Sequence, residues 1–86
     1  MSAETIAPVL RSYIASNLLF TGDSFGYGDD ASFLGEGIID SVGVMELVLF
    51  VEQEFSIKVE DRDVTRENFD SIHNLARYIA SQVVTQ

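Results

Sequence analysis

The sequence predicts an all-α fold, a small four-helix bundle with three main helices and one short one. Apolar residues recur every three or four positions in three separate stretches, which is the period of an amphipathic helix. The alternating residues Ile57 and Val59 could form a short extended piece, but the chain offers no second strand to pair with it. The 86 residues suit one small domain that buries roughly 60% of its unfolded surface, so we expect residues 1–86 to form a single unit.

The first helix is predicted from about Thr5 to Leu18. Pro8 is expected in its first turn, where backbone N–H groups lack intrahelical partners in any case. The residues that share one face of this helix are Ile6, Val9, Leu10, Tyr13, Ile14 and Leu18.

Helical periodicity is lost between Phe20 and Ile39, where glycines and aspartates accumulate. We expect an ordered crossover loop, because it contains apolar residues that can hold it to the core: Phe25, Tyr27, Phe33, Leu34, Ile38 and Ile39. The stretch from Asp23 to Leu34 has the length of a calcium loop, but Phe25 and Tyr27 occupy ligand positions and Leu34 replaces the final glutamate. No metal site is predicted.

The central stretch begins with Asp40 and Ser41 and continues as a long apolar and acidic run to Phe55. Asp40 is a good N-cap, so Ser41 is expected at the first helical position with an exposed hydroxyl. Ile39 and Val44 can form a hydrophobic staple across this start. A phosphate ester on Ser41 would lie near free backbone N–H groups at the positive end of the helix.

The apolar residues of this helix are too numerous for one face. At about 100° per residue, one group forms a core stripe: Val44, Leu47, Val48, Val51 and Phe55. A second group lies on the opposite side near Glu46 and Gln53: Val42, Met45 and Leu49. Together with Asp40 and Glu46, this second stripe is interpreted as a docking surface.

The remainder of the chain is predicted to hold the short helix and the last helix. A brief helical turn is expected from Asp61 to Thr65, with Val64 inward and Asp63 in water. Either Asp70 or Ser71 can cap the last helix. Its apolar stripe comprises Ile72, Leu75, Ala76, Ile79 and Val83. The predicted core of the bundle comprises Leu10, Ile14, Leu47, Val48, Val51, Phe55, Val59, Leu75, Ala76 and Ile79.

The charge balance restricts the partners. With 14 acidic and 5 basic residues the net charge is -9, which disfavours nucleic acid and anionic membranes and favours basic protein surfaces. There is no cysteine, no apolar run of membrane-spanning length and no signal-peptide pattern, so a cytoplasmic location is expected. The chain is also expected to be a monomer.

Asp40-Ser41, the following Val-Gly-Val-Met-Glu-Leu-Val and the later Val-Glu-Gln-Glu-Phe resemble the signature of acyl carrier proteins and peptidyl carrier domains. The resemblance extends from about Thr5 to Gln82. It implies that Ser41 carries a 4'-phosphopantetheine arm, donated by coenzyme A through a phosphopantetheinyl transferase. It also implies that Phe33 and Leu34 pack inward and that the interior can shelter an acyl chain.

A protein of that family would be a non-catalytic carrier of acyl or aminoacyl thioesters, presented to loading and condensing enzymes with basic docking surfaces. The resemblance leaves open fatty-acid, polyketide, nonribosomal-peptide and D-alanine-transfer pathways. Gly43 and the segment from Asn68 to Ile72 depart from the commonest fatty-acid pattern and favour a specialised pathway.

The same residues also have simpler structural interpretations. Asp-Ser before a helix is a common cap, and Met45 and Leu49 could be ordinary exposed surface or a homodimer contact. The alternative function is an acidic helical adaptor without a prosthetic group. A hydrolase is disfavoured, because His73 is the sole histidine and no cysteine is present.

Overall fold

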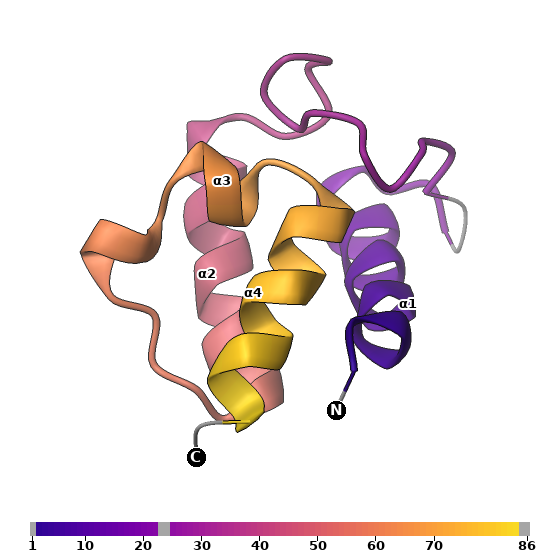
Figure 1. Cartoon of the computed structure of the whole chain (residues 1–86). Coiled ribbons are helices and arrows are strands. Elements are labelled where there is room, and N and C mark those ends of the chain that lie inside the picture. The colour runs from indigo at the N-terminus through magenta and orange to yellow at the C-terminus, as the bar shows by residue number, and fades with distance from the viewer. Residues whose placement is uncertain (1, 23–24, 85–86) are drawn as a thin grey trace.

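The computed structural model describes residues 2–22 and 25–84, with residue 84 described by its backbone alone. Within these ranges the chain is helical and contains no strand, which confirms the predicted all-α class (Figure 1). The elements in order are α1 (Ala3–Tyr13), the π-helical turn η1 (Ile14–Leu18), α2 (Ser41–Phe55), the 3-10 turn η2 (Asp61–Asp63), α3 (Arg66–Phe69) and α4 (Ile72–Val84).

The first helix begins earlier than predicted and changes type before it ends. The carbonyl of Ser2 accepts the N–H groups of Thr5 and Ile6 at 3.1 Å each, so α1 starts at Ala3. Pro8 therefore lies inside the helix, beyond the first turn where it was expected, at an exposed position. The predicted end at Leu18 is the end of η1, because the last turn widens from α to π geometry.

The end of η1 is closed by a residue in an unusual backbone conformation. The N–H of Thr21 donates to the carbonyl of Ala15 at 2.8 Å, six residues back, and that of Leu19 donates to Ile14 at 2.9 Å. Phe20, between the two donors, has φ of 57°. This left-handed position at a helix end is usually taken by glycine.

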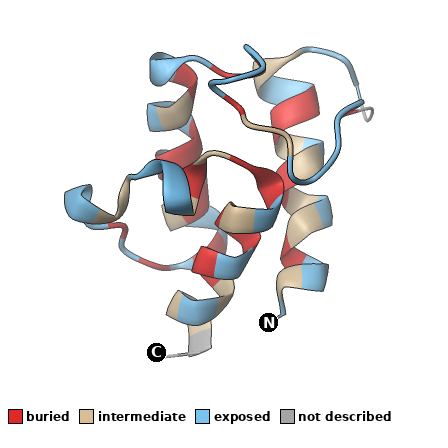
Figure 2. Ribbon diagram, turned by 45° about the horizontal axis from the view of Figure 1, so that its top comes forward, coloured by how far each residue is buried: buried red, intermediate tan, exposed pale blue. Residues whose placement is uncertain are grey.

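The core is formed where α4 packs along α1 and against α2. All ten residues of the predicted bundle core are buried, and Ile6, Ile72 and Phe69 join them. Figure 2 shows buried stretches alternating with exposed ones along each of these helices, as expected for amphipathic elements with one face covered.

The crossover loop is ordered by its apolar residues, although two of the predicted anchors are wrong. Phe25 and Phe33 are buried and their rings meet edge to face with centroids 6.5 Å apart. Ile38 and Ile39 are also buried. Tyr27 is exposed, and its only anchoring ring contact in the described loop is an edge-to-face one with Phe25, with centroids 5.5 Å apart. Leu34 is exposed as well, for a reason given with the site below.

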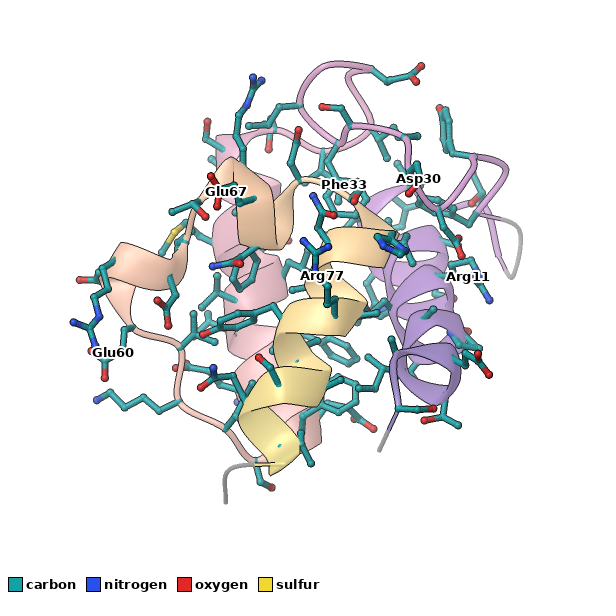
Figure 3. The ribbon with its side chains drawn as sticks, in the orientation of Figure 1. Arg11, Asp30, Phe33, Glu60, Glu67 and Arg77 are labelled. Carbon is teal, nitrogen blue, oxygen red and sulfur yellow. The ribbon has the colours of Figure 1, made fainter. Side chains whose placement is uncertain are left out.

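The loop is tied down at both sides by polar contacts. The Arg11 guanidinium of α1 pairs with the Asp29 carboxylate at 2.7 Å. Figure 3 labels Arg11 on this helix. On the other side the Ser32 hydroxyl and the Leu34 N–H both donate to the Asp70 carboxylate, and the Phe33 N–H donates to the Asp70 carbonyl at 2.8 Å. The loop is thus fixed to α1 and to the junction between α3 and α4.

The segment between α2 and α4 differs from the prediction. The short helix α3 begins at Arg66, after the 3-10 turn that occupies most of the predicted range. Asp63 was expected in water but is half-buried, and its carboxylate accepts the Tyr78 hydroxyl at 2.9 Å. Burial, followed by this hydrogen bond, raises the pKa of Tyr78 to about 12. The bond ties the segment before α3 to α4.

The cap of α4 is Ser71, one of the two predicted residues. Its side-chain oxygen accepts the N–H of Asn74 at 3.1 Å, and Ser71 is buried. Asp70 does not cap α4, because its carboxylate is used by the crossover loop.

Candidate functional site

The candidate site is the start of α2, where Asp40 and Ser41 lie side by side. Asp40 has an extended backbone, and its carboxylate accepts the N–H of Gly43 at 2.8 Å. Its carbonyl accepts the N–H of Val44 at 3.0 Å, which begins the helical pattern. The predicted N-cap is therefore confirmed, and Ser41 is the first helical residue, exposed to solvent.

The electrostatic setting of Ser41 follows from this geometry. The N–H groups of Ser41 and Val42 come before the first intrahelical hydrogen bond and lie at the positive end of the α2 dipole. Such a helix start stabilises a phosphate group covalently held beside it. His73, the sole histidine of the sequence, lies exposed in the first turn of α4.

Gly43 fixes how the chain enters α2. A Cβ placed on Gly43 would lie 2.4 Å from Cγ2 of Ile39, which is buried. Because that contact is too close for any real Cβ, the absence of a side chain lets Ile39 pack directly over the first turn. The residue noted in the sequence as a departure from the common pattern thus positions the segment that leads into Ser41.

The two apolar stripes of α2 are separated as predicted, with one exception. Leu47, Val48, Val51 and Phe55 are buried, while Val44 is only half-buried and is not a core residue. On the other side the exposed fractions are 68% for Val42, 57% for Met45 and 60% for Leu49. Asp40 and Glu46 are exposed as well. The structure therefore gathers the predicted recognition residues on one uncovered face.

A pocket of about 140 Å³ lies between α2 and the α3 segment. Its apolar lining comes from Leu34, Val44, Val64 and Phe69, and its polar lining includes Arg66 and Asp70. This explains why Leu34 and Val44, both predicted to pack inward, are partly exposed: their side chains border the pocket. The sequence did not reveal this pocket, because its walls come from three separate segments.

Phe50 was assigned to neither stripe of α2. Its ring stacks on Tyr13 of α1 with centroids 3.8 Å apart and an interplanar angle of 12°. Burial, with a further contribution from the negative charge of Glu46, raises the pKa of Tyr13. Glu46 lines the same surface hollow as Asn17 and Leu18, so it lies on the side of α2 that faces the end of the first helix.

Neither a metal site nor a membrane span is found in the part of the chain that the structure describes. No three potential metal ligands gather there, and no helix is both long and apolar enough to cross a membrane. Asp23, the first residue of the rejected calcium loop, lies outside the described residues.

The family comparison agrees with this geometry. The family model for the phosphopantetheine attachment site matches residues 8–79, which includes α2, both flanking segments and most of α4. This match confirms the resemblance drawn from the sequence. Members of this family bind a covalently attached 4'-phosphopantetheine, and carrier domains of this kind interact with partner enzymes without being catalytic themselves. The chain therefore belongs to the phosphopantetheine-binding carrier protein family.

Proposed function

We propose that Ser41 is the attachment position and that the chain acts as one non-catalytic carrier unit. The observation that carries this proposal is the exposed Ser41 hydroxyl at the first position of α2, beside the cap formed by Asp40. The Ser41 oxygen would form an ester bond to the β-phosphate of coenzyme A, with release of the nucleotide portion. A separate transferase would remove the hydroxyl proton.

The carrier's own residues would orient the modified serine rather than react. Asp40 and Gly43 hold the helix start in place, and the dipole of α2 offsets the negative charge of the phosphodiester. When bound, the arm supplies a thiol that holds acyl or aminoacyl groups as thioesters. The chain would contribute no acid or base to later steps.

The size of the pocket beside α2 supports a small cargo. An apolar cavity of about 150 Å³ accepts benzene, so 140 Å³ gives room for a short acyl or a small aminoacyl group. The apolar walls formed by Leu34, Val64 and Phe69 suit the hydrocarbon part, and Arg66 and Asp70 lie at the polar side. A long fatty chain would require the pocket to widen. We therefore favour a specialised pathway over bulk fatty-acid synthesis.

Recognition by partner enzymes is assigned to the exposed face of α2. Val42, Met45 and Leu49 form its apolar part, and Asp40 and Glu46 give it negative charge. With a net charge of -9, encounters with basic enzyme surfaces are accelerated, while the apolar residues supply modest affinity. Brief and repeated docking with several enzymes suits this combination.

The proposal is tested by intact mass spectrometry after incubation with coenzyme A and a broad-specificity phosphopantetheinyl transferase. We expect the mass of one arm on the wild-type protein, mapped to the peptide that contains Ser41. Ser41→Ala should fold and remain unmodified, and Ser12→Ala, an exposed serine on α1, should be modified like the wild type. No addition to the wild type under conditions that modify a known carrier would favour the adaptor function instead.

A further inference from the structure

A surface groove of about 450 Å³ lies between the end of the first helix and the start of α2. Leu18 and Phe20 line it on the side of the first helix, and Val42 and Glu46 line it on the side of α2. The groove is separate from the pocket beside α3, since Val44 borders the pocket alone.

Ser41 lies between the groove and the pocket. At about 100° per residue, Val42 lies about 100° from Ser41 in one direction around α2, and Val44 lies about 60° away in the other. A group attached to the Ser41 oxygen therefore begins between the two hollows. Because such a group is tethered, its entry into the groove is intramolecular, and weak contacts are enough to hold it there.

The polar lining of the groove offers hydrogen-bond acceptors. The side-chain nitrogen of Asn17 donates to the carbonyl of Tyr13 at 3.2 Å. Among the described residues, the side-chain oxygen of Asn17 and the carboxylate of Glu46 accept no hydrogen bond. An occupant with N–H or O–H groups would supply the missing donors.

The apolar lining is exposed and includes a strained residue. Phe20 has φ of 57°, a conformation that disfavours an L side chain. Its ring is 81% exposed, so burial in the core does not offset this strain. Val42 is also exposed. An occupant that covers both side chains would remove apolar surface from water, which favours binding.

The 4'-phosphopantetheine arm has the chemistry that this lining requires. Beyond its phosphate it carries a carbon with two methyl groups, a hydroxyl, two amides and a terminal thiol. This part of the arm is uncharged, so the acidic residues Asp40 and Glu46 do not repel it. Its methyl groups are apolar, and its amide N–H groups and hydroxyl are donors. The phosphate itself stays at the start of α2, beside the free N–H groups.

We propose that the arm, when it carries no cargo, lies in this groove with its methyl groups on Phe20 and Val42. Its amide N–H groups then point toward Glu46 and Asn17. The proposal rests on the proposed function, because it requires the arm to be attached to Ser41. It gives the two hollows different occupants: the groove takes the empty arm, and the pocket remains for the cargo.

The first test is nuclear magnetic resonance of the modified wild-type protein, with the arm labelled with ¹³C through the coenzyme A used for attachment. We expect nuclear Overhauser effects between the methyl protons of the arm and the ring protons of Phe20. Effects to Val64 and Phe69 instead would place the empty arm in the pocket. Either that result or the lack of any effect between arm and protein would overturn the proposal.

The second test compares matched variants at two left-handed positions. Ser56 has φ of 55° and is exposed at the C-terminal end of α2, roughly 22 Å from Ser41 at 1.5 Å per residue. Asparagine tolerates this conformation, so Phe20→Asn removes the ring and Ser56→Asn is its control. The urea midpoint of each protein is measured before and after the arm is attached.

The charge of the phosphate acts equally on all three proteins, so differences between them report on the rest of the arm. Attachment should raise the midpoint of Ser56→Asn as much as that of the wild type, and that of Phe20→Asn clearly less. Equal changes in all three would show that the arm does not contact Phe20 and would overturn the proposal. If no arm can be attached to the wild type, the proposed function fails as well. If the arm is attached but does not contact the groove, only the present proposal fails.

Discussion

The two faces of α2 are both strongly apolar, yet only one of them is covered. Leu47 and Val51 on the inner face are fully buried, whereas Val42, Met45 and Leu49 on the outer face are more than half exposed. Apolar content alone therefore does not distinguish core from surface in this helix. The two faces are distinguished by the position of each residue along the helix, counted from the cap at Asp40. That position determines which side chains face the rest of the bundle.

The largest expected difference between the faces is in the cost of removing a leucine side chain. Leu47→Ala should lower the free energy of unfolding by about 2–5 kcal/mol, because the buried side chain leaves a cavity. Leu49→Ala removes the same atoms from the same helix, so helix propensity cancels, and its cost should be below about 1 kcal/mol. Urea denaturation of both unmodified variants measures this, and equal losses would contradict the assignment of the faces.

A substitution at Gly43 tests how tightly the chain packs where the exposed face of α2 meets the buried one. It is buried although its neighbour Val42 is exposed, and an added Cβ would collide with Ile39. Gly43→Ala should destabilise the protein by up to about 2 kcal/mol, since overpacking costs about 1–3 kcal/mol and the gain in helix propensity offsets ~1 kcal/mol of it.

The control for Gly43 is a double-mutant cycle. Ile39→Ala removes the colliding Cγ2 and is itself destabilising, but adding Gly43→Ala to it should then be neutral or stabilising. Additive losses in the cycle would show that the contact with Ile39 is not the reason for glycine.

The smallest stability effect is expected at Met45. Met45→Ala on the exposed face should change the free energy of unfolding by less than about 0.5 kcal/mol. The same variant should weaken docking of the transferase, with little dependence on salt because no charge is altered. Thermal unfolding and modification kinetics measure the two effects. A loss comparable to that of Leu47→Ala would mean that the faces are reversed.

The sequence predicted the features that depend on local pattern. The three main helices, the cap at Asp40, the exposed Ser41 and the core residues all follow from spacing and end signals. What it missed depends on contacts between distant segments. Asp63 appeared solvated because its partner Tyr78 lies 15 residues away, and Val44 appeared buried because the pocket beside it is formed by other segments.

Phe20 was missed for a different reason. In the sequence it is only the first residue of a loop, and no pattern indicates that its backbone is left-handed or that its ring stays in solvent. Both facts follow the π-helical turn that precedes it, a rare form that no sequence pattern indicates.

The hydrogen bonds between the crossover loop and Asp70 also bear on the order of events during folding. Ser32 and Asp70 are 38 residues apart, so this part of the loop gains its contacts only after the junction before α4 has reached its place. The loop leads directly into Asp40 and borders the pocket beside α2. A nascent chain that stops short of Asp70 would have the Ser41 sequence without these bonds. The placement of the segment that leads into Ser41 therefore depends on a residue far later in the chain.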